Sequence, residues 1–118
     1  MDQLTEQIIG CAYAVANTLG CGFLEKVYEN ALALELRRAD MKVKQQQVIK
    51  VRYRGVVVGD YCADLLVNDA VVVELKAASG LEEIHSAQCL NYLKATGLRV
   101  CLLINFGKPK IQIKRLMF

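Results

Sequence analysis

The sequence predicts an α/β domain in which helices pack on a mixed β-sheet. Two N-terminal segments carry apolar residues at helical spacing, and three segments with the features of strands follow, the first of which alternates apolar and basic residues. A further helical segment then leads into a strand that is almost entirely apolar. The predicted order is α-α-β-β-β-α-β-β, an antiparallel meander followed by a right-handed crossover helix into a parallel strand. We expect a single domain over residues 1–118.

The N-terminal part of the chain predicts two helices. The apolar residues of the first are Leu4, Ile8, Ala12, Val15 and Leu19, which recur at helical spacing. This helix ends at Gly20-Cys21-Gly22, because glycine is common just after a helix terminus. The second helix runs from about Phe23 to Arg38, and Asp40 begins the exit from it.

A change to period two predicts three strands in the middle of the chain. Their predicted ranges are Val43 to Arg54, Val56 to Val67 and Ala70 to Lys76, separated by turns at Gly55 and at Asn68-Asp69. In the first strand, Ile49, Val51 and Tyr53 alternate with basic residues. That alternation is typical of a half-exposed strand.

The C-terminal part predicts the crossover helix and two more strands. The helix opens at Ser79-Gly80, has Glu82-Glu83 in its first turn and ends near Gly97. Residues 98–105 (LRVCLLIN) predict a strand buried on both faces. Alternation after the turn predicts a final edge strand over about residues 110–114.

Composition limits the class of protein. Hydrophobic residues make up 54% of the chain and charged residues 23%, which is typical of a globular domain. No apolar run approaches the ~18 residues of a membrane span. The N-terminus lacks the features of a signal peptide, so we expect a cytoplasmic protein. The net charge of +3 permits a nucleic-acid partner without arguing for one.

The cysteines argue against a zinc site. The five cysteines are scattered, no C-x-x-C pair occurs, and His85 is the only histidine. We expect reduced thiols, buried in the apolar stretches that contain most of them.

The clearest chemical signal lies in residues 60–77 (DYCADLLVNDAVVVELKA). Glu74 and Lys76 are two apart in a predicted strand, so their side chains point to the same face. Asp64 lies on the preceding strand and opposes Glu74 only if the turn is centred on Asp69. A two-residue loop would send the two carboxylates to opposite faces, whereas a three-residue loop or a bulge would bring all three side chains together.

Two carboxylates beside an ammonium group suit metal-assisted phosphodiester hydrolysis. Carboxylate oxygens are preferred ligands of Mg²⁺ and Mn²⁺, which polarise a phosphate and lower the pKa of a bound water. A lysine nearby orients that water or stabilises the developing charge. The alternative is a solvent-facing salt bridge at a strand end. Glu74 follows three valines, which counts against this alternative, because an ionised group in a buried strand needs a partner or a metal.

Other side chains are candidates with open alternatives. Glu25 shares a helix face with Tyr28, and it either caps the start of that helix or faces the site. Gln88 and Tyr92 are four apart and therefore lie on one face of the crossover helix, with His85 one turn before them. Tyr92 has the alternative of an ordinary packed tyrosine, and His85 that of an exposed or core-edge histidine.

The chain resembles the GxxExxY family of the PD-(D/E)XK nuclease superfamily. Residues 22–28 (GFLEKVY) have the G-x-x-E-x-x-Y pattern, and the similarity extends from about Gln7 to Arg115. The blocks ADLLV (63–67), VELKA (73–77) and LLINF (102–106) are similar to those of the family and stand in the same order. The resemblance implies a restriction-endonuclease-like core.

The resemblance also implies a set of site residues. The nuclease-type site would consist of Glu25, Asp64, Glu74 and Lys76, and the metal ligands of Asp64, Glu74 and the Leu75 backbone carbonyl. Gln88-x-x-x-Tyr92 is similar to the Q-x-x-x-Y motif of RecB-like nucleases, so we expect these residues and Tyr28 to position the substrate.

Three positions depart from the family pattern. The resemblance leads us to expect a histidine at Ala16, a proline at Cys21 and a basic residue at Cys62. The acids and the lysine of the site are intact. Ala16 and Cys62 are therefore the first positions to test for reduced activity or weaker phosphate binding.

Three functions are compatible with these features. The first is a Mg²⁺- or Mn²⁺-dependent nuclease, with DNA favoured over RNA. The second is a catalytically weak or inactive nuclease-like module that binds nucleic acid or a protein partner. The third is a structural oligomerisation domain with a fortuitous salt-bridge cluster, and so apolar a chain is compatible with a homodimer. Candidates for phosphate contacts, or simply for a solvated strand face, are Lys42, Lys44, Lys50, Arg52 and Arg54.

Overall fold

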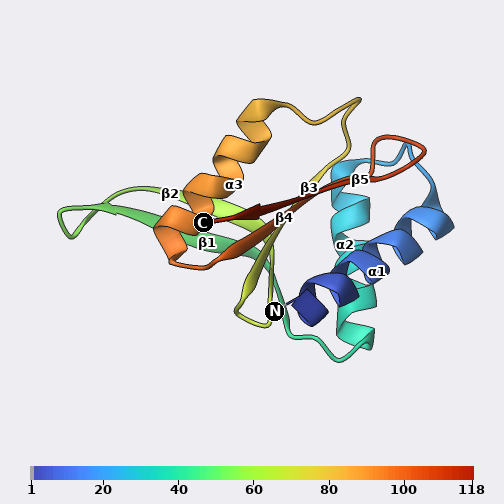
Figure 1. Cartoon of the computed structure of the whole chain (residues 1–118), viewed down its shortest axis with the longest axis horizontal. Helices are drawn as coiled ribbons and strands as arrows, with labels where there is room; N and C mark the ends of the chain where they lie inside the picture. The colour runs from blue at the N-terminus through green and yellow to red at the C-terminus, as the bar shows by residue number, and fades with distance from the viewer. Residues whose placement is uncertain (1) are drawn as a thin grey trace.

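The computed structural model describes residues 2–118, which form three helices and five strands in the predicted order (Figure 1). The helices are α1 (Asp2–Leu19), α2 (Glu25–Arg38) and α3 (Glu83–Thr96). The strands are β1 (Val43–Tyr53), β2 (Val56–Val67), β3 (Val71–Lys76), β4 (Val100–Asn105) and β5 (Gln112–Met117). Within residues 2–118, no helix has both the length and the apolar character needed to cross a membrane.

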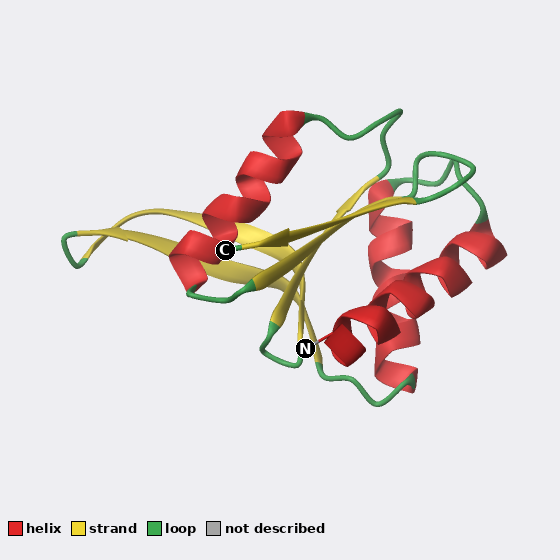
Figure 2. Cartoon of the chain, in the orientation of Figure 1, coloured by secondary structure: helices red, strands yellow, loops and turns green. Residues whose placement is uncertain are grey.

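All five strands belong to one mixed sheet in the order β1-β2-β3-β4-β5 (Figure 2). β1, β2 and β3 form an antiparallel meander. The chain then passes through α3 and enters β4, which lies parallel to β3, and β5 pairs antiparallel with β4 at the edge. These pairings confirm the predicted meander, crossover and edge strand.

Helices cover both faces of the sheet (Figure 1). α1 and α2 pack on one face against a core that includes Leu65 and Val73. α3 packs on the other face over Val72, Cys101 and Leu103. Because helices cover both of its faces, β4 is buried along its whole length, as its apolar sequence predicts.

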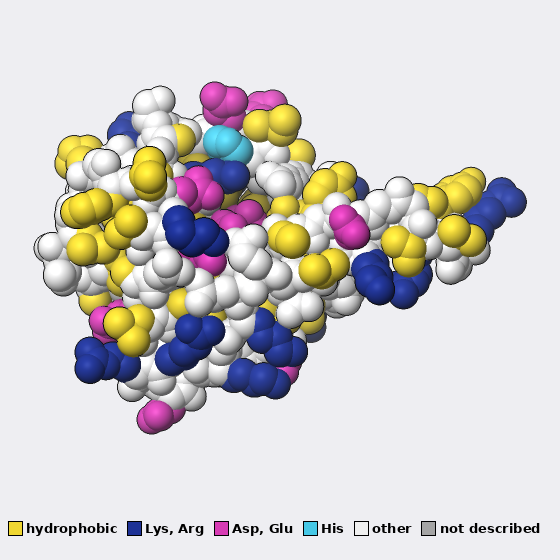
Figure 3. All heavy atoms as spheres, turned by 180° about the vertical axis from the view of Figure 1, so that it is seen from behind, with side chains coloured by type: hydrophobic (Ala, Val, Ile, Leu, Met, Phe, Trp, Pro, Cys, Tyr) yellow, Lys and Arg dark blue, Asp and Glu magenta, His cyan; other side chains and the backbone are white. Residues whose placement is uncertain are grey.

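The β1–β2 hairpin extends beyond the helices as an arm (Figure 1). Residues 52–60 are all exposed, and the molecule measures 46 × 31 × 22 Å. Apolar and basic side chains lie along this arm, at the right of Figure 3. The half-exposed pattern predicted for the first strand holds as far as Val51 but fails at Tyr53, which is 63% exposed because no helix reaches that part of the sheet.

α3 begins later than its predicted opening at Ser79-Gly80. Glu82 is the N-cap residue: its side chain accepts the His85 N–H, and its own N–H donates to His85 Nδ1 at 3.1 Å. This reciprocal capping satisfies two N–H groups that the helix leaves unpaired, and so it sets the start of the helix at Glu83.

All five cysteines are free thiols. Cys89 and Cys101 are buried, as expected for apolar segments, and Cys11 is half-buried. The expectation of burial is wrong for Cys21 and Cys62, which are exposed. Cys21 lies in the loop between α1 and α2, and Cys62 lies where β2 approaches the exposed arm.

Candidate active site

The β2–β3 hairpin brings Asp64 opposite Glu74. Leu65 pairs with Val73, and residues 68–70 form a three-residue loop between the strands. The first two loop residues have φ values of 52° and 53°, a conformation that asparagine and aspartate tolerate better than most residues. The register is therefore the one that the predicted site requires, and the two-residue alternative is excluded.

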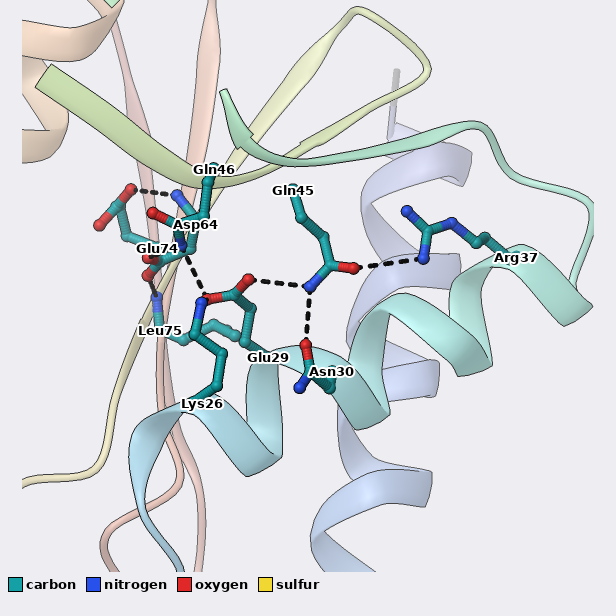
Figure 4. Close-up of polar contacts among 9 residues, drawn as sticks. All are labelled: Lys26, Glu29, Asn30, Arg37, Gln45, Gln46, Asp64, Glu74 and Leu75. Carbon is teal, nitrogen blue, oxygen red and sulfur yellow. Dashed lines mark hydrogen bonds and ion pairs between the residues drawn. The ribbon is translucent and has the colours of Figure 1, made fainter. Parts of the chain in front are cut away.

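The backbone pairing of β2 with β3 ends at Leu65 and Val73, and beyond it the side chains of Asp64 and Glu74 accept the hydrogen bonds between the two strands (Figure 4). The Asp64 N–H donates to Glu74 Oε1 at 2.9 Å, and the Leu75 N–H donates to Asp64 Oδ2 at 2.8 Å. Each carboxylate thus accepts a backbone N–H of the opposite strand. This exchange fixes both side chains and holds the two acids side by side.

β2 changes the face to which its side chains point at Asp64. Ala63 packs with the core under α3, whereas Leu65 packs with the core under α1 and α2. Residues two apart in a regular strand share a face, so the pleat is interrupted here. Gln46, opposite Asp64 in β1, has a φ of 51°, which costs a non-glycine residue about 1–2 kcal/mol. Backbone strain of this kind is common at functional sites.

Gln46 connects Asp64 to α2 through the buried Glu29 (Figure 4). Gln46 Nε2 donates to Glu29 Oε1 at 2.8 Å and to Asp64 Oδ1 at 3.3 Å. Glu29 is 3% exposed and also accepts hydrogen bonds from Lys26 at 2.9 Å and from Gln45 at 2.8 Å. These donors compensate a carboxylate that has lost its contact with water, and the network holds β1 and α2 against Asp64.

Sequence reasoning does not identify Glu29 or Gln46. Glu29 follows Glu25 by four residues and so lies one turn further along the same face of α2, which is the signal that could have found it. No sequence pattern marks Gln46, because strand alternation does not reveal a positive φ.

Glu74 is a buried acid in the centre of the sheet, with only 4% of its surface exposed. Burial raises the pKa of its carboxyl to about 8, and the neighbouring Asp64 raises it as well. The Asp64 N–H and, more weakly, Lys76 act in the opposite direction on this pKa. Glu74 therefore exchanges its proton near neutral pH, where a bound cation would favour the ionised form.

Lys76 and Glu25 reach the two acids from different elements. Lys76 is half-buried at the end of β3, and Glu25 is in the first turn of α2, where its charge suits the helix dipole. Burial raises the pKa of the Glu25 carboxyl, Lys76 lowers it and Asp64 raises it. Glu25 thus begins the helix and also lies close enough to Lys76 and Asp64 to interact with both.

Asn105 holds the backbone that follows Lys76. Its Oδ1 accepts the N–H groups of Ala78 and Gly107, each at 3.0 Å. Its Nδ2 donates to the Ala78 carbonyl at 3.0 Å and to Gln112 Oε1 at 2.9 Å. A Cβ on Gly107 would lie 2.3 Å from backbone atoms of Ala78, so only glycine allows this approach. The clamp fixes the end of β3 and thereby the position of Lys76.

α3 places Tyr92 and Gln88 beside the acids. Gln88 Nε2 donates to the Tyr92 hydroxyl at 2.6 Å, and that hydroxyl donates to the Cys62 carbonyl at 3.4 Å. Burial raises the pKa of Tyr92, and the nearby Glu74 raises it further. Tyr92 is buried and Gln88 half-buried. Their predicted part in positioning a substrate stays a prediction.

Tyr28 holds the loop that precedes α2. Its hydroxyl donates to the Gly20 carbonyl at 2.6 Å and accepts the Phe23 N–H at 3.2 Å. Its buried ring stacks on Phe106, with centroids 4.8 Å apart. Any effect of Tyr28 on a substrate, which also stays a prediction, would therefore be indirect, through the loop that presents Glu25.

The donors available to a cation at this site are oxygens. Among the side chains that the structure describes, no group of three or more histidines, cysteines, aspartates or glutamates is arranged to hold a metal ion. Asp64 and Glu74 nevertheless form an adjacent pair whose mutual repulsion contributes to the raised pKa of Glu74. A hard divalent cation relieves such repulsion, so the pair fits Mg²⁺ or Mn²⁺ as two ligands of a set completed by backbone carbonyl, water and phosphate oxygens.

The fold combines an antiparallel meander with a crossover helix, and its central hairpin carries an Asp…Glu-x-Lys set. This combination is typical of a class of nuclease folds. The model of the PD-(D/E)XK nuclease superfamily matches residues 2–116, and the chain belongs to this superfamily. The fold is that of the restriction-endonuclease-like core of these proteins.

One solved structure extends this comparison. The crystal structure of SSO0001 has a TM-score of 0.60 and 18% sequence identity to the chain. The match covers 98% of this chain and 58% of that chain. At this identity the likeness concerns the fold alone. No curated protein matches the chain.

Proposed function

We propose that the chain is a divalent-metal-dependent nuclease of the GxxExxY type, acting on DNA in preference to RNA. The observation that supports this proposal is the exchange of hydrogen bonds between Asp64 and Glu74 across β2 and β3, with Lys76 two residues further on. It holds two acids side by side, and Lys76 lies close enough to lower the pKa of Glu74 and of Glu25. The motif in residues 22–28 supports the GxxExxY assignment.

Each residue of the site has a part in the proposed reaction. Asp64, Glu74 and the Leu75 backbone carbonyl would hold Mg²⁺ or Mn²⁺, which when bound polarises the scissile phosphate and lowers the pKa of a water. Lys76 orients the attacking water and stabilises charge that develops on the phosphate. Glu25, which interacts with Lys76, completes the acidic set.

A module that binds nucleic acid or a protein partner without cleaving is the second candidate. It is favoured by the absence of a three-ligand cluster among the described side chains. It is also favoured because one oxygen of Asp64 and one of Glu74 already accept a backbone N–H. In such a module Lys76 would contribute to affinity rather than to turnover.

The melting temperature in the presence of metal ions tests the proposed site. A cation that binds only the folded protein raises this temperature, so millimolar Mg²⁺ or Mn²⁺ should raise it. Asp64→Asn should remove most of the rise and leave the metal-free protein equally or more stable, because it removes repulsion with Glu74. Asp69→Asn, exposed in the β2–β3 loop, is the matched control and should keep the rise. A melting curve of the parent protein that neither ion moves contradicts the metal site.

A further inference from the structure

A groove between α3 and the β1–β2 hairpin leads away from the acids. Two adjoining cavities of about 340 and 430 Å³ lie along it and share Tyr61 and Asn91 in their walls. Gln88 and Tyr92 line the smaller cavity, which is therefore the one next to Glu74. The larger cavity lies further out along the arm.

The outer cavity concentrates positive charge. Lys50 and Arg52 from β1 and Lys94 from α3 line it, and we call these three residues the basic cluster. None of the three takes part in an ion pair among the described residues, whereas Lys44, elsewhere in β1, is paired with Asp69 at 3.1 Å. The described lining of the two cavities contains no acidic residue. A ligand that suits three basic residues in the walls of one cavity is an anion with several charges.

Tyr61 separates the two cavities and offers an aromatic surface to the groove. Its ring lies at 58° to that of Tyr92, with centroids 5.8 Å apart, and the residue is 49% exposed. Part of the ring therefore rests on the protein while the remainder is open to a ligand. A nucleic-acid base stacks on such a ring when it is not already stacked in a helix. A duplex presents base edges and phosphates instead.

We infer that this groove binds a single strand of nucleic acid, with a base stacked on Tyr61 and phosphates held by the basic cluster. The strand then passes Gln88 and reaches the two acids. This inference deepens the proposed function and rests on it for the destination of the strand. The binding itself can be measured without cleavage.

Binding in EDTA tests the inference. Fluorescence anisotropy is measured with labelled oligonucleotides of about 12 nucleotides, a length that spans a typical single-strand site. DNA and RNA are each offered as a single strand and as the matching duplex. The parent protein should prefer the single strand to the duplex by about tenfold or more, and the two sugar types identify which nucleic acid it takes.

Substitutions at Tyr61 test the stacking. Tyr61→Ala should weaken single-strand binding by about tenfold, whereas Tyr61→Phe keeps the ring and should bind as the parent does. Tyr53→Ala is the matched control, because Tyr53 is an exposed tyrosine of the same arm outside both cavities, and it should leave affinity unchanged. Melting temperatures establish that each variant is folded.

Substitutions in the basic cluster test the phosphate contacts independently of Tyr61. Removing Arg52 and Lys94 together should lower the slope of log affinity against log salt by about 1.4, since each phosphate contact contributes about 0.7 on a single strand. Lys108→Ala, at an exposed lysine outside both cavities, should leave the slope unchanged.

The outcomes separate this inference from the proposed function. Single-strand binding in the groove is contradicted if the duplex binds with equal affinity, or if folded Tyr61→Ala binds as the parent does. Either result would hold even if the protein cleaves DNA. Displacement of the strand by polyglutamate as readily as by unlabelled strand also overturns it, because stacking is then not needed. Tight, Tyr61-dependent binding without cleavage in any metal supports the groove and contradicts the nuclease.

Discussion

At the level of single residues, Glu74 couples the site to pH. Its pKa is raised from an ordinary value of 4.5 to about 8 in the folded protein. The folded state therefore retains a proton that the unfolded state releases between these two values. This contribution to stability is fully present below about pH 4.5, is lost as the pH rises towards about 8, and changes no further above that.

We predict that the metal-free protein melts at a lower temperature as the pH is raised from about 5 to about 8. Glu74→Gln stays neutral and keeps a hydrogen-bond acceptor, so it should remove most of this loss, on the order of a few kcal/mol. Thermal unfolding in EDTA at a series of pH values measures the effect, with the exposed Glu83→Gln as control. Parallel pH curves for the parent and Glu74→Gln would show that Glu74 does not titrate in this way.

Gln46 combines backbone strain with a position next to Asp64, and two substitutions separate these properties. Gln46→Ala and Gln46→Gly both remove the contact with Asp64, and each should lower the rate of cleavage by about tenfold, the usual effect of losing a residue that orients a metal ligand. Of the two replacements, only glycine accepts the φ of 51° without strain. The free energy of unfolding measured in urea should therefore be higher for Gln46→Gly than for Gln46→Ala, by about 1 kcal/mol. Gln47→Ala, one residue further along β1, should cleave as the parent does. A parent-like rate in both Gln46 variants contradicts the positioning role.

At the level of elements, periodicity is sufficient to predict the helices and strands. The predicted range of β2 agrees with the observed Val56–Val67, because a glycine turn and an Asn-Asp turn bound the segment. The start of α3 was not predictable from pattern, because it depends on a reciprocal contact between Glu82 and the His85 side chain. The edge strand β5 lies further along the chain than the predicted range of about 110–114, because its pairing with β4 begins at Gln112 and continues to Met117.

The candidate site was predictable only in part, for a related reason. Sequence spacing places Glu74 and Lys76 on one face, but the partner of Glu74 depends on the length of the β2–β3 loop, which alternation alone does not decide. Two positive φ values decide it. Gln46 and Glu29 depend on an interrupted pleat and on packing between β1 and α2, which are tertiary effects that leave no periodic signal.

The loop between β4 and β5 supports β3, and this gives a prediction for two glycines. Gly107→Ala should force the Ala78 backbone aside, which disturbs Lys76 and costs about 1–3 kcal/mol in urea unfolding, the usual effect of overpacking. Gly10→Ala lies in α1 with no atom within 4 Å of the new Cβ, so it should stabilise the protein by about 0.5–1 kcal/mol through helix propensity. Equal stability of the two variants would show that Gly107 does not need its close approach to Ala78.

At the scale of the whole molecule, the site lies between a helical body and a projecting arm. Acidic and basic side chains gather near the middle of the body on the face shown in Figure 3, and the arm extends to the right of it. The two acids lie on the strands at the centre of the sheet, which helices cover on both faces, while the groove with its basic cluster follows the arm. The covered centre of the sheet thus holds the two acids in place, while the exposed arm carries the proposed groove for a long ligand.

A comparison of cleavage by the parent protein and by Lys76→Ala tests the proposed nuclease site. Labelled single-stranded and duplex DNA and RNA are incubated with each protein in Mg²⁺, Mn²⁺ or EDTA, and affinity is measured in parallel. The parent protein should cleave, and its cleavage should require a divalent ion. Lys76→Ala should abolish cleavage with little loss of affinity, because Lys76 acts mainly in the transition state. Lys108→Ala, exposed in the loop before β5, should behave as the parent does. Two results together would contradict the nuclease site. The parent protein would bind nucleic acid without metal-dependent cleavage of any substrate, and Lys76→Ala would lose as much affinity as the variant that lacks Arg52 and Lys94.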